Sequence, residues 1–135
     1  MTLQTTQQSL AKWHHMIQAS DLSALNELLD DAVVFRSPVA FKPYEGKQVV
    51  FFILTNVIQV FENFTYHREF YTEDGENVVL EFSANVSGKS LKGIDMIRFN
   101  EQGKIIDFEV MIRPMSGLAA LAEKMGERFA KYQPN

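Results

Sequence analysis

An aspartate in segment 91–100 lies at a position where a β-strand would place an apolar side chain. The sequence of this segment, LKGIDMIRFN, has the pattern of a strand in which successive side chains point to opposite faces. Asp95 shares its face with apolar or small residues, while the other face carries several polar ones. The residues of the Asp95 face are Leu91, Gly93, Asp95, Ile97 and Phe99.

The neighbouring strands can be aligned with this one through two turn signals, at residues 88–89 and 102–103. If each pair forms a two-residue hairpin loop, Phe82 lies opposite Asp95 on one side and Val110 lies opposite it on the other. Both hairpins surround Asp95 with apolar residues, so they predict that it points into the core. The same pairing sets Leu80 opposite Ile97, Ala84 opposite Gly93, Phe108 opposite Ile97 and Ile106 opposite Phe99.

A carboxyl group in such a place must find a partner or keep its proton, because an unpaired buried charge costs several kcal/mol. Burial raises the pKa of an acid by disfavouring its charged form. A neutral carboxylic acid in an apolar pocket can donate a hydrogen bond to a substrate, which makes Asp95 a candidate catalytic residue. The alternative is a structural role, in which Asp95 pairs with a backbone amide, an arginine or a histidine.

His67 is a candidate catalytic base, and its position depends on the register of the strand around it. A tight loop at 74–75 pairs His67 with Phe82 and turns it toward Asp95. A slip of one residue turns His67 outward and points Tyr66 and Arg68 inward instead. The alternation of Phe64, Tyr66 and Phe70 favours the slipped register, and both alternatives remain open at this stage.

The adjacent histidines His14 and His15 do not predict a metal site. Neighbouring residues on a helix point about 100° apart, so the two rings cannot chelate one ion. The sequence has no histidine and carboxylate set with metal-ligand spacing such as H-x-x-x-H. We therefore expect neither a metal nor another cofactor.

The elements that would position these residues follow from the apolar periodicity and the turn signals. Helical spacing predicts a first helix over residues 6–19, a second one opening with Asp21 as N-cap, and a very apolar third one over 47–61. Segment 32–38 reads as a short strand that enters a loop at a proline. Four strands separated by turns follow, and a helix over 116–131 ends the chain. This order predicts a single α+β domain over residues 1–135.

Composition narrows the classes of partner. The chain has 135 residues, a formal net charge of −4 and no cysteine. The acidic balance argues against nucleic acid as a partner, and the lack of cysteine rules out disulfides and thiolate chemistry. The N-terminal residues show no signal-peptide pattern, and the longest apolar run, 49–54, is too short to span a membrane. We therefore expect a cytoplasmic protein with no membrane partner.

Two stretches of the sequence and the order of the predicted elements resemble a known superfamily. They are QASDLSALNELLDDAVVFRSPVAFKPYEGK, GIDMIRFNEQGKIIDFEVM and the overall order of helices and strands, and together they cover nearly the whole chain. The sequence resembles the nuclear transport factor 2-like superfamily, and within it the ketosteroid isomerase and polyketide cyclase (SnoaL-like) branch. The resemblance implies a cystatin-like α+β barrel, in which a curved antiparallel sheet is wrapped by the N-terminal helices into a cone with a deep apolar pocket.

The resemblance also assigns site residues, with two departures. Asp95 matches the family's protonated aspartate, which donates a hydrogen bond to the substrate oxygen. The family's oxyanion tyrosine on the first helix falls at Trp13, which can donate a hydrogen bond but has no acid proton. The family's catalytic base, the aspartate before the loop proline, falls at Ser37. A serine cannot take a proton from carbon unless another group activates it.

We expect from these observations a pocket protein that acts on a small, largely apolar, oxygen-bearing molecule. If it is an enzyme, the expected reaction is proton transfer beside a carbonyl, with Asp95, Ser37 and His67 as the catalytic candidates. The alternative is a non-catalytic ligand-binding or dimerisation module. The residues expected to form the ligand-binding wall are Trp13, Phe35, Ile53, Phe82, Ile97, Phe108, Val110 and Ile112.

The sequence also supports expectations about the convex sheet face and the C-terminal helix. The convex sheet face mixes methionines with charged residues, and in the resembling family such a face packs against a second subunit, which predicts a homodimer. The C-terminal helix has an apolar stripe of Leu118, Leu121, Met125 and Phe129. It is expected to dock on the sheet, and two alternatives, covering the pocket mouth or extending the dimer, remain open.

Overall fold

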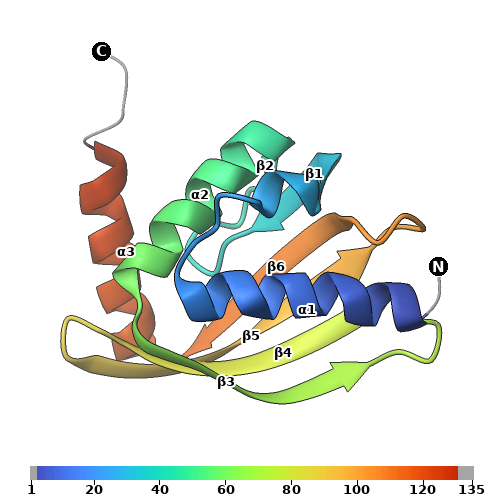
Figure 1. Ribbon diagram of the computed structural model, residues 1–135. Coiled ribbons are helices and arrows are strands. Elements are labelled where there is room, and N and C mark those ends of the chain that lie inside the picture. The colour runs from blue at the N-terminus through green and yellow to red at the C-terminus, as the bar shows by residue number, and fades with distance from the viewer. Residues whose placement is uncertain (1–2, 131–135) are drawn as a thin grey trace.

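The computed structural model describes residues 3–130, and Figure 1 shows a curved sheet with helices packed around it. Helix α1 lies along one side of the sheet, α2 lies beyond it on the same side, and α3 stands at one end. The elements are α1 (Leu3–Ala19), η1 (Leu25–Glu27), β1 (Leu29–Arg36), β2 (Tyr44–Glu45), α2 (Lys47–Val60), β3 (Glu62–Tyr71), β4 (Asn77–Val86), β5 (Lys89–Phe99), β6 (Ile105–Arg113) and α3 (Met115–Ala130).

The six strands form one sheet in the order β2-β1-β6-β5-β4-β3. All neighbouring pairs are antiparallel except β1 and β6, which run parallel. The sheet is therefore mixed, and the expectation of a fully antiparallel one is wrong at this junction. The strand order leaves β2 and β3 as the two edges, so the sheet is curved but not closed into a barrel. The predicted α+β class is confirmed.

Helix α1 packs on the sheet through the stripe that the helical spacing predicted. Leu10, Trp13 and Met16 are all buried. The helix ends at Ala19, and Ser20 then takes a positive φ of 53° that turns the chain out of the helical path. The first element thus places Trp13 against the interior of the sheet.

The second predicted helix, opening with Asp21, does not form. Residues Leu25–Glu27 make a short 3-10 turn instead, and the Asp21 carboxylate accepts a hydrogen bond from the Ser23 amide at 3.0 Å. The physical reason is length, because β1 already begins at Leu29. The leucines that suggested a helix, Leu22, Leu25, Leu28 and Leu29, are all buried where the chain turns into the sheet.

The other boundaries lie within a few residues of the expectation. Strand β1 runs from Leu29 to Arg36 rather than over 32–38, and the two-residue strand β2 lies in the stretch expected to be a loop. The third predicted helix is α2, and α3 begins one residue before the expected start. The predicted last residue of that helix, Lys131, lies outside the described part of the chain. No helix within residues 3–130 is long and apolar enough to cross a membrane.

The register between β4 and β5 differs from the expectation by two residues. Leu80, and not Phe82, lies opposite Asp95, while Phe82 lies opposite Gly93 and Val78 opposite Ile97. The loop consists of Ser87 and Gly88, because Val86 pairs with Lys89; both loop residues have positive φ. A slip of two residues keeps every side chain on its face, so the inward direction of Asp95 survives the error.

The register between β5 and β6 follows the expectation over most of its length. Asp95 lies opposite Val110, and Ile97 lies opposite Phe108. At the end of the pair Phe99 lies opposite Ile105 rather than Ile106, because the register shifts between Arg98 and Phe99.

Gly93 allows an unusually close approach within this sheet. A Cβ atom at Gly93 would lie 2.5 Å from the carbonyl oxygen of Met111 and 2.6 Å from the Phe82 ring. The missing side chain therefore makes room for the buried Phe82 ring directly across the strand pair.

Candidate functional site

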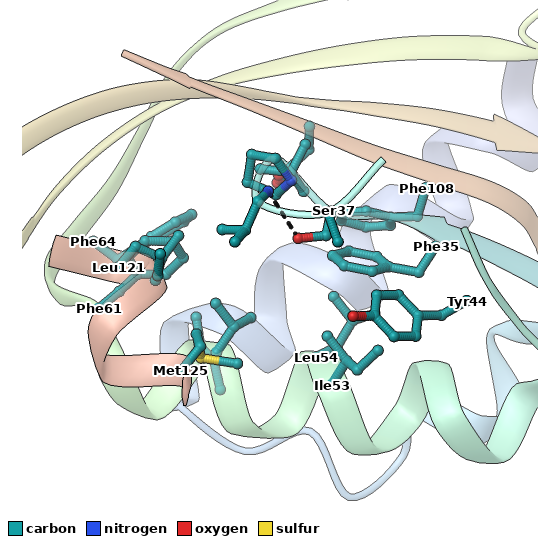
Figure 2. Close-up of a pocket in the computed structure, with 18 of the residues that line it drawn as sticks. Phe35, Ser37, Tyr44, Ile53, Leu54, Phe61, Phe64, Phe108, Leu121 and Met125 are labelled. Atoms are coloured by element: carbon teal, nitrogen blue, oxygen red, sulfur yellow. Dashed lines mark hydrogen bonds between the residues drawn. The ribbon is translucent and has the colours of Figure 1, made fainter. Parts of the chain in front are cut away.

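A cavity of about 210 Å³ opens between the concave side of the sheet and the helices. A single water needs only about 10–15 Å³ on this kind of measure, so the cavity has room for a small organic molecule. Figure 2 shows part of its wall, with Phe35, Tyr44 and Phe108 on one side and Phe61, Phe64 and Leu121 on the other. Most of its lining side chains are apolar, and the polar ones are Trp13, Ser37, Tyr44, Tyr66 and Asp95.

Asp95 lies in the wall of this cavity and is 5% exposed. Strand β5 points it inward, and its neighbours across the sheet, Leu80 and Val110, are apolar. Burial raises the pKa of the Asp95 carboxyl to about 7, although the hydrogen bond from Tyr66 acts in the opposite direction. The acid is therefore poised to be either neutral or charged at neutral pH.

Tyr66 is the hydrogen-bonding partner of this acid. Its hydroxyl donates to Oδ2 of Asp95 at 2.6 Å, and its oxygen accepts a hydrogen bond from Nε1 of Trp13 at 2.9 Å. Burial and the nearby Asp95 carboxylate raise the pKa of the Tyr66 hydroxyl well above its usual value. The three side chains come from α1, β3 and β5, so the network joins elements that are distant in sequence.

The second carboxyl oxygen of Asp95 is open to the cavity. Tyr66 is the only hydrogen-bonding partner of the Asp95 side chain within residues 3–130, and it uses Oδ2. Every fully buried side-chain oxygen or nitrogen of the described residues has a partner. Oδ1 has none and is therefore not fully enclosed, which leaves it facing the free space beside Asp95.

Aromatic rings hold the Tyr66 side chain in place. Phe64 and His14 each meet the Tyr66 ring edge-on, with centroid separations of 4.9 Å and 5.1 Å, and the ring of Phe82 lies 6.4 Å away. His14 in turn is hydrogen-bonded to Glu69 on β3. These contacts fix the ring plane, so the hydroxyl reaches Asp95 from a defined direction.

The structure settles the register question left open for β3. Tyr66 lies opposite Phe82 and faces inward, whereas His67 is exposed on the other face and hydrogen-bonds Ser83 Oγ at 2.7 Å. The placement of His67 beside Asp95 is therefore wrong. Arg68 does not point into the cavity either, because a register shift between Tyr66 and Glu69 turns it to the convex face, where it pairs with Glu81.

Ser37 lies in the cavity wall, as Figure 2 shows beside Phe35 and Phe108. Its Oγ accepts a hydrogen bond from the backbone amide of Val39 at 3.0 Å. Such a bond is typical of a serine that stabilises a turn. The bond uses a lone pair of Oγ and leaves its hydroxyl proton free to bind a polar group in the cavity.

The expected wall residues divide into two groups. Trp13, Phe35, Ile53, Phe108 and Val110 line the cavity. Phe82, Ile97 and Ile112 do not, since the first two are packed inside the core and Ile112 lies in the neighbouring apolar cluster. These three share the concave side of the sheet with Asp95 but lie beneath or beyond the residues that reach the open space.

Helix α3 forms one side of the cavity. The wall expected from the sequence included no residue of this helix. Leu121, Met125 and Phe129 all line it. The helix is attached to α2 by Arg128, whose Nε donates to Oδ1 of the buried Asn56 at 3.1 Å, and by the stacking of Phe129 on Phe52. The helix packs on the sheet as expected, with Gly117 against Leu91 of β5, and it also forms part of the cavity wall. That it covers the pocket mouth or extends a dimer stays a prediction.

Tyr66 and α3 are thus the main additions to the sequence-based site. The alternation of Phe64, Tyr66 and Phe70 carried a signal for Tyr66, because it favoured the register that points it inward. The apolar stripe of α3 carried a weaker signal, since it shows that one face is buried but not against what. No group of three or more histidine and carboxylate side chains in the described chain is arranged to hold a metal ion.

Comparison with known proteins places this architecture in a family. The family model of the SnoaL-like domain matches residues 10–108. A crystal structure described as a steroid delta-isomerase from Pseudomonas aeruginosa is 57% identical, with a TM-score of 0.93 over 95% of this chain and 93% of that one. None of the curated proteins matches the sequence.

Two other solved structures extend the comparison. A protein with a cystatin-like fold from Silicibacter pomeroyi is 34% identical, with a TM-score of 0.82 over 89% of this chain and 84% of that one. A nuclear transport factor 2-like protein from Mesorhizobium loti shares the fold at 17% identity, with a TM-score of 0.73 over 82% and 93% of the two chains. The chain therefore belongs to the SnoaL-like domain family.

Proposed function

We propose that this protein binds a small, largely apolar molecule through a carbonyl oxygen, which accepts a hydrogen bond from Oδ1 of neutral Asp95. The observation that carries the proposal is the placement of this acid in the wall of an apolar cavity, with one oxygen held by Tyr66 and the other open. Ser37, at another part of the wall, would contact a second polar group of the ligand.

The charge of the cavity supports a neutral ligand. Asp95 is the only acidic or basic side chain among the described residues that line it. An anionic ligand would find no cation there, and it would meet a carboxylate whenever Asp95 is ionised. A carbonyl needs only a donor, which a protonated acid in a site of low polarity supplies.

The protonation state of Asp95 predicts a pH dependence of stability. The folded-state pKa is raised from 3.8 to about 7, so the folded protein keeps a proton that the unfolded chain has lost. Stability therefore falls as the pH rises between these two values. Relative to Asp95→Asn, we expect the wild type to lose about 2–3 kcal/mol between pH 5 and pH 8, measured by urea unfolding.

The control for this measurement is Asp31→Asn, because the Asp31 side chain is 96% exposed. Its difference from the wild type should be nearly the same at both pH values. Parallel stability curves for Asp95→Asn and the wild type would show that Asp95 is charged in the folded protein, against the proposal.

Ligand binding can be tested with a matched pair of probes, 2-acetylnaphthalene and the hydrocarbon 2-ethylnaphthalene. At pH 6 we expect the ketone to bind about tenfold more tightly, because it alone accepts the hydrogen bond from Asp95. Asp95→Leu should remove this preference while the hydrocarbon still binds. The measurement is a fluorescence titration, with His67→Gln as the control on the opposite face. Equal affinities in the wild type would contradict the proposal.

A second candidate function is isomerisation by proton transfer beside the bound carbonyl. It is favoured by the 57% identity with a protein described as a steroid delta-isomerase. The described lining residues include one carboxyl group, and Ser37 stands where the resembling family has its base. Binding is accordingly the function that the geometry supports best, and turnover is the second.

Substitution of Ser37 by aspartate tests this second candidate. We expect Ser37→Asp to convert a β,γ-unsaturated ketosteroid to its conjugated isomer at least tenfold faster than the wild type, because it adds a general base to the wall. Ultraviolet absorbance of the conjugated enone follows the reaction. Ser37→Asn has the same size without a base and should give no increase, and an equal rate in the two variants would contradict an isomerase geometry.

We further propose that two copies of the chain associate through the convex sheet face. Met96 and Met111 are 39% and 46% exposed there. Met111 lies beside the ion pair of Arg68 with Glu81, and Met96 lies opposite Glu109. Methionine and arginine are enriched at protein interfaces relative to the rest of the surface. The expectation of a cytoplasmic location stays a prediction.

Light scattering after size-exclusion chromatography measures this association. We expect a dimer for the wild type and a monomer for Met96→Lys/Met111→Lys, because each copy would then have to bury two added charges in the interface. Phe41→Lys changes a fully exposed residue of another segment and should stay dimeric. A monomeric wild type would contradict the dimer and leave the pocket proposal unaffected.

A further inference from the structure

Trp13, Tyr66 and Asp95 form a chain of hydrogen bonds whose direction is set by chemistry. The indole Nε1–H of Trp13 can only donate, so the Tyr66 oxygen must be the acceptor at 2.9 Å. The Tyr66 hydroxyl then has its own proton to give, and Oδ2 of Asp95 lies 2.6 Å away. Trp13 is 3% exposed and packs on Phe108 with ring centroids 5.4 Å apart, so this donor is fixed in place.

From this geometry we infer that Trp13 is a positioning residue, which orients the Tyr66 hydroxyl so that the proton of neutral Asp95 is held on Oδ1 and directed at the ligand. The inference rests on the proposed carbonyl-binding function and deepens it. It assigns to the indole a role in specificity that does not require contact with the ligand.

The position of the acid proton on Asp95 depends on which acceptor sites of the carboxyl and hydroxyl groups are already used. The Tyr66 proton points at Oδ2, and the carbonyl oxygen of a neutral carboxylic acid accepts a hydrogen bond more strongly than its hydroxyl oxygen, so this bond favours Oδ2 as the carbonyl oxygen and Oδ1 as the protonated one. For Oδ2 to donate the acid proton to Tyr66, the Tyr66 hydroxyl would have to rotate away and give up the hydrogen bond that it makes to Asp95. The Trp13 donation opposes this rotation, because it occupies one lone pair of the Tyr66 oxygen.

The network should also respond as a unit when the ligand or the pH changes. A tyrosine that accepts a hydrogen bond becomes a stronger donor, so the indole strengthens the bond from Tyr66 to Asp95. The Trp13 hydrogen bond accordingly lowers the pKa of Tyr66, against the effect of burial. Ionisation of Asp95 should therefore change the chemical shift of the Trp13 N–H, two hydrogen bonds away.

Few other charged groups face this network. On the β4 and β6 sides Asp95 meets Leu80 and Val110, and the residues of α2 and α3 that line the cavity are uncharged. The titratable groups near Tyr66 are Glu69 on β3 and His14 on α1, which are hydrogen-bonded to each other. An experiment must therefore separate Asp95 from His14.

The wild-type protein allows a direct test, because Trp13 is the only tryptophan in the sequence. Its indole N–H gives a single resonance in a ¹H–¹⁵N NMR spectrum. We expect this resonance to shift with a midpoint near the pKa of Asp95, about 7, and to shift again when 2-acetylnaphthalene binds but much less with 2-ethylnaphthalene. In Asp95→Asn the midpoint should disappear, and any shift that remains comes from groups other than Asp95.

The variant Trp13→Phe tests the specificity role. It keeps an aromatic ring but removes the donor, so we expect the preference for the ketone over the hydrocarbon to fall about threefold. The midpoint of the pH dependence of ketone binding should move upward, because Tyr66 then stabilises the Asp95 carboxylate less well. The matched control is Phe35→Leu, which also trims the wall and should weaken both probes equally.

The possible outcomes separate this inference from the proposed function. If wild type shows no ketone preference, the carbonyl-binding function fails. If the preference exists and Trp13→Phe retains it in full, with an unchanged pH midpoint, the positioning role of Trp13 is wrong while the function stands. If the indole resonance does not shift with the ionisation of Asp95 or with the binding of the ketone, the inference is overturned, even if Trp13→Phe does not fold.

Discussion

Burial of one carboxyl group in an apolar wall is the constraint on which the site depends. A charged Asp95 would lose its hydration and find no cation to compensate, so burial shifts its pKa to about 7. Tyr66 offsets part of this cost by a hydrogen bond to one oxygen. The other oxygen remains available. A neutral acid there can donate a hydrogen bond to a ligand, because little water competes for that bond in a site of low polarity.

The architecture supplies this arrangement through three separate elements. Alternation along β5 turns Asp95 inward, the register of β3 brings Tyr66 across from Phe82, and α1 lays Trp13 against the tyrosine. Helix α3 then encloses the cavity from one end, held by Arg128 and Phe129. A change in any of these elements would expose the acid to water or leave it without its partner.

The chain belongs to the SnoaL-like family but differs from the resembling isomerases at Trp13 and Ser37, and the two differences have a common physical consequence. The position that holds a tyrosine in the resembling isomerases holds a donor without an acid proton here, while a tyrosine from β3 reaches the aspartate instead. The wall thus keeps a hydrogen-bonding acid but has a serine in place of the base. This difference is a reason for the proposal that the site binds a carbonyl rather than depending on a separate carboxylate base.

The sequence by itself determined the fold class, the helix stripes and the inward direction of Asp95, because the periods of 3.6 and 2 are local properties of the chain. The inward direction survived a two-residue register error for the same reason. Only the tertiary structure decided that Tyr66 and not His67 faces the acid, that Asp21 opens a short turn and that α3 forms part of the cavity. These outcomes depend on a register shift, on the distance between elements and on packing between segments far apart in sequence, none of which a local pattern records.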